Sequence, residues 1–358
     1  MPKTPLYDVL ARSGAQMGEY SGVETARSFG EVTREFRELA FRELASGCAV
    51  YDLGWRAKVA VKGEDRVRWL NGMVTNNIKE LPLNQGNYSF ILNPQGRILG
   101  DLYTYNRGDY LLIDTERSQL ENLLKLFNHF IIMDDVEVFD KSAELTAVGI
   151  QGPNAGKILE QTAIHDPGLK SMQLADITWN GINVTLTRMA SDEFVTYELW
   201  IATNVVAQLW NALIDAGALP VGSEALEKFR IMIGFPKYGT DIRERDLPQE
   251  TEQDHALNFT KGCYIGQEIV ERIRSRGAVH RTFRGFLLNG DLPGRGSKLE
   301  VDGKDVGEIT SVSRIPAQNG EHAVALGYIR REVLERGARI TYPGGEAKPS
   351  ELPFSLAS

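Results

Sequence analysis

The stretch from Lys261 to Ile273 constrains the fold of this chain more than any other part of its sequence. Apolar residues recur there at the spacing of one buried helical face, at Ile265, Ile269, Val270 and Ile273. Gly262 is a suitable turn residue before that helix. Cys263 is therefore expected at or just before a helix N-terminus, two residues from Lys261, and both features favour a thiolate. The alternative is that Cys263 is a small buried apolar residue, as single cysteines commonly are.

Length and composition limit the classes of protein to which the chain can belong. A chain of 358 residues suggests two or three domains, and 42% hydrophobic residues can supply their cores. A formal charge of −8 argues against general binding to nucleic acid. Two cysteines, Cys48 and Cys263, fit a reducing compartment rather than a disulfide scaffold. Without an apolar signal segment or a run of about 18 apolar residues, we expect a cytoplasmic protein that does not enter a membrane.

Short strands and helices follow one another through the first two thirds of the chain, after a polar segment that runs to about residue 30. Helices are predicted at 31–47, from 63, at 118–130 and at 204–216. Strands are predicted at 50–61, 88–92, 98–105, 110–113, 136–139, 145–150, 183–186 and 198–201. The sequence Asn93-Pro94-Gln95-Gly96 is a hairpin turn signal between two of these strands. This order predicts an α+β fold rather than a regular βαβ alternation.

From about Arg281 the sequence changes to short apolar runs separated by Gly, Asn, Asp and Pro. These runs lie at 286–288, 298–301, 306–311 and 323–329. Such spacing predicts a small antiparallel β-barrel at the C-terminal end.

The octapeptide Lys261-Gly262-Cys263-Tyr264-Ile265-Gly266-Gln267-Glu268 resembles the K-G-C-[FY]-x-G-Q-E signature of YgfZ-type folate-binding proteins, a branch of the glycine-cleavage T-protein superfamily. The resemblance extends from about Thr4 to Arg331 and includes Val74-Thr75-Asn76-Asn77 and Val306-Gly307-Glu308-Ile309-Thr310-Ser311. It implies a three-domain cloverleaf around a folate pocket, with two α+β domains that contain antiparallel sheets and a C-terminal barrel. The implied domains are 1–140 with 225–280, 141–224, and 281–358.

Two departures from the T-protein pattern favour the YgfZ branch. The T-protein G-G-x-x-D-D motif has an acidic pair, whereas this chain has Gly100 followed by Asp101. The T-protein G-Y-T-G-E-D-G motif supplies a glutamate that binds the pterin. The corresponding stretch here, 188–194, lacks those glycines but contains Glu193.

The resemblance implies site residues, and each also has a structural interpretation. Cys263 and Asp101 are the candidate catalytic residues, and Asp101 is either a folate-binding acid and proton carrier or an exposed acid beside a turn. Glu193 is suited to the amino and N–H groups of a pterin. Arg230 either pairs with a folate carboxylate or forms an internal salt bridge. The remaining candidates for the folate site are Tyr264, Gln267 and Glu268.

A basic run of Arg272, Arg274, Arg276, His280, Arg281 and Arg284 is suited to an anionic folate tail, or to pairing with Glu268 and Glu271. Five scattered histidines and the cysteines show no metal-ligand spacing, so no metal site is predicted.

The sequence therefore supports three functional interpretations. The first is a tetrahydrofolate-binding protein that supports iron–sulfur cluster assembly or repair, with client iron–sulfur proteins or assembly factors as partners. The second is a folate-dependent aminomethyl- or methyltransferase of the T-protein type. The third is a relative that has lost folate binding.

Overall fold

The structure is a computed structural model, and it describes residues 1–40, 47–190, 194–277, 279–317 and 320–355. The chain forms two compact units. Unit 1 consists of Met1–Asn71, Asn77–Ser89 and Leu102–Leu226. Unit 2 consists of Gly72–Asn76, Phe90–Asp101 and Glu227–Ser358. Each unit therefore combines segments that are distant in the sequence. The three-domain boundaries given above stay a prediction.

A six-stranded sheet lies in unit 1, in the order β10-β11-β12-β9-β3-β13. Its strands are β3 (Ala49–Asp52), β9 (Leu145–Gln151), β10 (Leu174–Trp179), β11 (Ile182–Arg188), β12 (Thr196–Ala202) and β13 (Leu219–Pro220). Neighbouring strands are antiparallel except for the short parallel pair β13–β3. Helices α5 (Ala155–Gln161) and α6 (Val206–Asp215) contribute buried apolar side chains to the same core. Strands β9 and β12 bury Val148, Ile150, Leu199 and Ile201 in this core.

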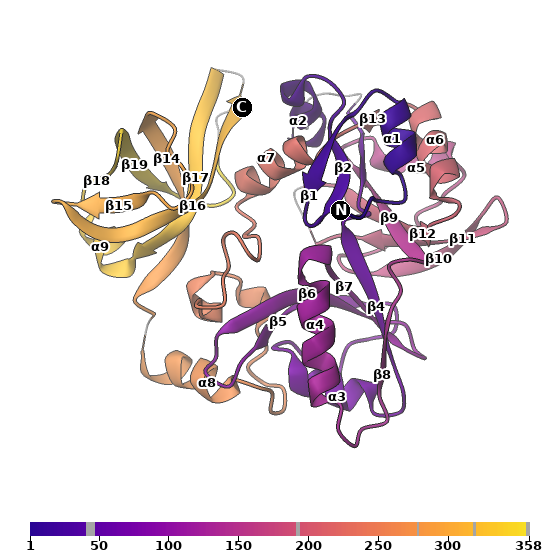
Figure 1. Cartoon of the computed structure of the whole chain (residues 1–358), viewed down its shortest axis with the longest axis horizontal. Coiled ribbons are helices and arrows are strands. Elements are labelled where there is room, and N and C mark those ends of the chain that lie inside the picture. The colour runs from indigo at the N-terminus through magenta and orange to yellow at the C-terminus, as the bar shows by residue number, and fades with distance from the viewer. Residues whose placement is uncertain (41–46, 191–193, 278, 318–319, 356–358) are drawn as a thin grey trace. The chain divides into compact units, whose positions relative to one another are not determined.

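A second, five-stranded sheet has the order β5-β6-β7-β4-β8. Its strands are β4 (Arg56–Lys62), β5 (Gly86–Leu92), β6 (Ile98–Asn106), β7 (Leu111–Glu116) and β8 (Glu137–Asp140). The amphipathic helix α4 (Arg117–Phe130) packs on this sheet and buries Leu123 and Phe127 (Figure 1). Helix α3 (Arg66–Met73) lies between β4 and β5 in the sequence.

The C-terminal strands close into a barrel in the order β14-β17-β16-β15-β18-β19, orange and yellow in Figure 1. They are β14 (Arg281–Gly290), β15 (Lys298–Val301), β16 (Lys304–Ala317), β17 (Gly320–Arg330), β18 (Ile340–Tyr342) and β19 (Gly345–Ser350), with α9 (Arg331–Arg336) after β17. The barrel core includes Phe286, Leu299, Ile309 and Ile329. The predicted α+β fold with antiparallel sheets and a small barrel is confirmed.

The segment before residue 30, which the sequence analysis described only as polar, contains regular secondary structure. It contains α1 (Tyr7–Arg12) and an antiparallel hairpin of β1 (Gln16–Tyr20) and β2 (Val23–Ser28). Leu10 and Val23 are fully buried, so this segment covers part of the core. The predicted helix at 31–47 is α2 (Val32–Ala40), and residues 41–46 lie outside the described part of the chain.

Four further helical segments lie between residues 223 and 276. They are α7 (Ser223–Ile233), α8 (Gln267–Arg276) and the short 3-10 helices at Pro248–Glu250 and Asp254–Ala256. Among the described residues, no helix has the length and apolar character needed to cross a bilayer.

Candidate functional site

The signature loop, defined here as residues 261–266, leads directly into α8 in unit 2. Gly266 is the N-cap of α8 and has φ +83°. A Cβ atom at Gly266 would lie 2.6 Å from the carbonyl oxygen of Asn93, in the turn between β5 and β6. Gly96, in the same turn, has φ +72° and would place a Cβ atom 2.8 Å from Ile269. The turn and the start of α8 therefore approach each other closely because two glycines allow it.

The side chain of Lys261 points away from solvent. Its Nζ donates hydrogen bonds to the backbone carbonyls of Val74 at 2.6 Å and Asn76 at 2.7 Å. Lys261 is 7% exposed, and burial lowers the pKa of its amine to about 7. A lysine with such a pKa is charged only in part at neutral pH, so Lys261 does not supply a full positive charge to the signature loop.

Tyr264 and Gln267 are organised around the same loop. The Tyr264 N–H donates to Gln267 Oε1 at 3.3 Å, and Lys261 Nζ lies 4.9 Å from the centroid of the Tyr264 ring. Burial, with a smaller contribution from the charge of Glu271, raises the pKa of Tyr264 to about 12. Glu268 is exposed in the first turn of α8, where the helix dipole favours an acid. An aromatic face, an amide and a carboxylate therefore lie within one short segment.

The two cysteines have opposite environments. Cys263 is exposed on the signature loop, three residues before the N-cap Gly266. The interpretation of Cys263 as a buried apolar residue is therefore wrong. Cys48 is 1% exposed, and burial raises the pKa of its thiol to about 12. Cys263 is the thiol that a solute can reach.

Asp101 lies on β6 and is half-buried. The neighbouring Tyr238 hydroxyl donates to the backbone carbonyl of Leu99 at 2.8 Å. Burial raises the pKa of Tyr238, and the charges of Glu244 and Asp101 contribute after it. Asp101 is thus close enough to Tyr238 to influence it, and it is not a fully exposed acid beside a turn.

Arg230 forms a dense internal network within unit 2. Its guanidinium donates twice to Glu227, at 3.0 and 2.7 Å, and once to Asp241 at 2.6 Å. It also donates to the Phe235 carbonyl at 2.6 Å and to Ser311 Oγ at 2.9 Å. These bonds use the five N–H donors of an arginine. Of the two interpretations of Arg230, this geometry matches the internal salt bridge.

Glu193 lies outside the described residues, but a nearby acid that the sequence analysis missed is Glu198 on β12. Glu198 is 5% exposed and accepts a hydrogen bond from Trp200 Nε1 at 2.9 Å. Burial and the charge of Asp114 raise its pKa, against the opposing charges of Lys58 and Arg56. In the sequence, Glu198 could have been recognised as an acid within an otherwise largely apolar strand.

Glu198 belongs to a buried charge cluster in unit 1. Asp114 pairs with Lys58 at 2.8 Å and with Arg56 at 2.7 Å, and the Lys58 and Asp114 side chains are completely buried. Buried groups with strongly perturbed protonation are common at functional sites, although structural ion pairs also produce them.

Three arginines of the predicted basic run, Arg274, Arg281 and Arg284, have acidic partners. Arg281 pairs with Asp246 at 2.6 Å and with Glu250 at 2.9 Å. Further pairs join Arg284 to Glu252 at 3.5 Å and Arg274 to Glu271 at 3.6 Å. The acids before the signature loop therefore neutralise much of this run. Binding of a folate tail here stays a prediction.

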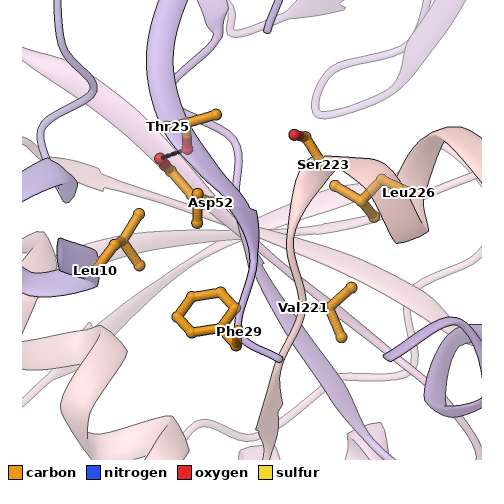
Figure 2. Close-up of a pocket in the computed structure, with 8 residues that line it drawn as sticks. Leu10, Thr25, Phe29, Asp52, Val221, Ser223 and Leu226 are labelled. Atoms are coloured by element: carbon orange, nitrogen blue, oxygen red, sulfur yellow. Dashed lines mark hydrogen bonds between the residues drawn. The ribbon is translucent and has the colours of Figure 1, made fainter. Parts of the chain in front are cut away.

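A small enclosed pocket in unit 1 is lined by Leu10, Thr25, Ala26, Phe29, Asp52, Val221, Ser223 and Leu226 (Figure 2). Asp52 accepts hydrogen bonds from the Thr25 hydroxyl at 2.7 Å and the Gly54 N–H at 2.8 Å. The pocket has about 0 Å³ of room for a water-sized solute, against the ~300–1,000 Å³ typical of small-molecule sites. It is a packing feature around a buried carboxyl.

Comparisons with known proteins place these features in a family context. Residues 6–261 match the GCVT N-terminal domain family. An aminomethyltransferase of Halothermothrix orenii is 27% identical over 353 residues, which cover 95% of each chain. An aminomethyltransferase of Geobacillus kaustophilus is 25% identical over 363 residues, with 99% of this chain and 98% of the relative covered.

A solved structure shows the same fold. The glycine cleavage system aminomethyltransferase T from Bartonella henselae superposes with a TM-score of 0.86 and 20% identity, covering 98% of this chain and 97% of that chain. At this identity the likeness concerns the fold.

Proposed function

Because the chain belongs to the GCVT N-terminal domain family, we propose that it binds tetrahydrofolate and transfers a one-carbon or aminomethyl group, as a folate-dependent transferase of the T-protein type. The observation that carries this proposal is the extent of the similarity. Relatives named aminomethyltransferase align with 95–99% of the chain, so the likeness includes both compact units and the barrel.

The residues of unit 2 fit a folate chemically. Tetrahydrofolate supplies nitrogen atoms that accept a one-carbon unit. The half-buried carboxyl of Asp101, beside Tyr238, would hold or move a proton at such a nitrogen. Gln267 and Glu268 offer polar groups at the start of α8, whereas Tyr264 beside them is 8% exposed. In this proposal Asp101 is the catalytic residue and the α8 segment contributes to folate binding.

The first test is a titration of the purified protein with reduced folates, followed by tryptophan fluorescence. We expect saturable binding that weakens at least about tenfold in Asp101→Asn, because a positioned charge-assisted hydrogen bond is lost. Asp109→Asn, an exposed acid on the loop after β6, is the matched control. Absence of binding by every reduced folate would remove the proposal.

A turnover assay separates a transferase from a binding protein. The protein is incubated with tetrahydrofolate and an aminomethyl donor, and methylene-folate and ammonia are measured. Formation of both products that depends on Asp101 supports the transferase. Tight folate binding with no product contradicts it.

The exposure of Cys263 favours a second candidate function. We propose, as the alternative, a YgfZ-type folate-binding protein that supports iron–sulfur cluster assembly or repair in the cytoplasm, with client iron–sulfur proteins or assembly factors as partners. An accessible thiol in the octapeptide is what such a role requires, and the T-protein acid pair is reduced here to Asp101. Cells that contain only the Cys263→Ala variant would then lose activity of cluster-dependent enzymes. Full activity in those cells would exclude the thiol role.

A further inference from the structure

The signature loop and the segment 72–76 are joined by contacts of two kinds. Backbone hydrogen bonds run from the Ile265 N–H of the loop to the Gly72 carbonyl and from the Asn258 N–H, shortly before the loop, to the Thr75 carbonyl, each 3.1 Å long. Contacts of the second kind come from the side chain of Lys261, which reaches the carbonyls of Val74 and Asn76. The Lys261 amine therefore joins the loop to this segment at two points.

We propose that Lys261 is a positioning residue, whose amine holds the signature loop on the segment 74–76 and thereby fixes the places of Cys263 and Tyr264. The two carbonyl acceptors, the 7% exposure and the Tyr264 ring 4.9 Å away carry this inference. It concerns the loop itself, so it goes beyond the proposed function and does not depend on folate.

The geometry implies that the loop opens more readily when Lys261 takes up a proton. A neutral amine has two N–H donors, which match the two carbonyls, and burial penalises its charged form. The pKa of this amine is about 7 in the closed loop, against 10.5 for a solvated lysine. At pH values between about 7 and 10.5, Lys261 is protonated in the open loop and neutral in the closed loop, so the open loop binds one more proton. The equilibrium constant for opening therefore falls about tenfold for each pH unit above 7 and is constant below it.

The other titratable groups around this contact are Tyr264 and Cys263 on the loop, His255 and Asp254 on the short helix that reaches Asn76, and Glu271 on α8. The thiol of Cys263 is controlled for by the Cys263→Ser background described below. The pKa of Tyr264 is raised to about 12, and burial lowers the pKa of His255 below its ordinary value of 6.5. Neither residue changes charge between pH 7 and 9.

The test measures hydrogen exchange of the Ile265 amide between pH 6 and 9. In an amide with a constant opening equilibrium, base-catalysed exchange accelerates about tenfold per pH unit. In the wild type we expect this rise below pH 7 and a nearly flat rate from pH 7 to 9, where the falling opening equilibrium cancels it. A full tenfold rise per unit above pH 7 in the wild type would overturn the proton dependence.

Variants separate the positioning role from general stability. Lys261→Met is expected to speed exchange at Ile265 by about tenfold or more at pH 8, because two hydrogen bonds are lost, and to restore the steady rise with pH. Lys261→Arg keeps a positive charge at every pH, so its Ile265 exchange rate should also rise about tenfold per pH unit throughout. Lys304→Met, an exposed lysine of the barrel, should match the wild type. The amide of Ile329, in the barrel, reports global unfolding in the same samples.

Two outcomes overturn the positioning role. One is an unchanged exchange rate at Ile265 in Lys261→Met. The other is an equal acceleration at Ile265 and Ile329, which would make Lys261 a general stabiliser. If Lys261→Met does not fold, Lys261→Arg and the wild-type pH profile decide the question. A Cys263→Ser background must leave the wild-type profile unchanged, because the ionisation of the thiol has no part in the proposal.

Discussion

Gly266 and Asn93 approach so closely that a Cβ atom on the glycine would lie 2.6 Å from the asparagine carbonyl oxygen. Real Cβ atoms do not come this near to a backbone oxygen. The approach brings the β5–β6 turn against the first turn of α8, and both segments belong to unit 2. The turn at 93–96 and the end of the signature loop can therefore pack this closely only because residue 266 has no side chain.

We therefore expect Gly266→Ala to lower the free energy of unfolding by about 1–3 kcal/mol, because φ at this position is +83° and the added carbon meets backbone. Urea unfolding measures the change. Gly262→Ala is the matched control, since a Cβ atom there meets nothing within 4 Å. Equal effects of the two substitutions would contradict the role of close approach.

Removal of the charge at Asp114 should strongly destabilise the folded protein. Asp114→Asn removes the buried carboxylate that pairs directly with Lys58 and Arg56, and we expect a loss of about 3–5 kcal/mol in the free energy of unfolding. Asp176→Asn, which breaks a pair with Arg107 on a 60% exposed acid, should cost less than about 1 kcal/mol. Similar losses for both variants would show that burial does not determine the cost.

Glu198 should make stability depend on pH. Because its pKa is raised in the folded state, the folded protein binds more protons than the unfolded chain above pH 4.5, so this residue lowers stability as pH rises through that window. Relative to Glu198→Gln, the wild type should thus be more stable at pH 4 than at pH 7. Chemical denaturation at the two pH values measures this. Glu160→Gln, an exposed acid, serves as control, and a pH-independent difference for Glu198→Gln would refute the expectation.

The Arg230 network predicts that this residue contributes to the stability of the fold and not to the affinity for folate. Arg230→Lys keeps one charge but loses the fork that contacts Glu227, Asp241 and Ser311 together, so we expect a loss of about 2–4 kcal/mol in stability. Folate affinity measured on the folded variant should stay within about twofold of the wild type. A large loss of affinity at unchanged stability would instead support a direct contact with the folate carboxylate.

Alkylation should distinguish the two cysteines. In the native protein at pH 7.5, iodoacetamide should modify Cys263 and leave Cys48 intact, because Cys48 is buried with a pKa of about 12. Peptide mass spectrometry identifies the modified site. In denaturant both thiols should react, and a modified Cys48 in the native sample would show that the core opens readily.

The sequence predicted those parts of the fold in which local pattern and burial agree. Helix α4 and the hairpin turn at 93–96 carry their own signals, an amphipathic period and an Asn-Pro-Gln-Gly turn. The predicted strand at 50–61 is instead β3 and β4, because Asp52 accepts the Gly54 N–H in a turn between them. The β1–β2 hairpin was missed because its strands are mixed in polarity and are stabilised by packing.

The candidate site was predictable where the octapeptide specifies it and not where distant segments meet. The place of Cys263 just before the N-terminus of α8 follows from local sequence, whereas its exposure and the N-cap at Gly266 come from the structure. The partners of Lys261 and Arg230 do not follow from local sequence, because Val74 and Ser311 lie 187 and 81 positions away. The acid at 198 was missed for the same reason, since its environment comes from the strands that carry Lys58 and Asp114.

The contact between Lys261 and Val74 has a consequence for how the protein is made. Synthesis proceeds at about 5–20 residues per second, so the 187 positions between these residues correspond to about 10–40 s. Throughout that time the segment 72–76 has emerged from the ribosome without the residues that complete unit 2. The signature loop is therefore assembled late, and a nascent chain that stops before residue 261 exposes the Val74 and Asn76 carbonyls to water or to chaperones.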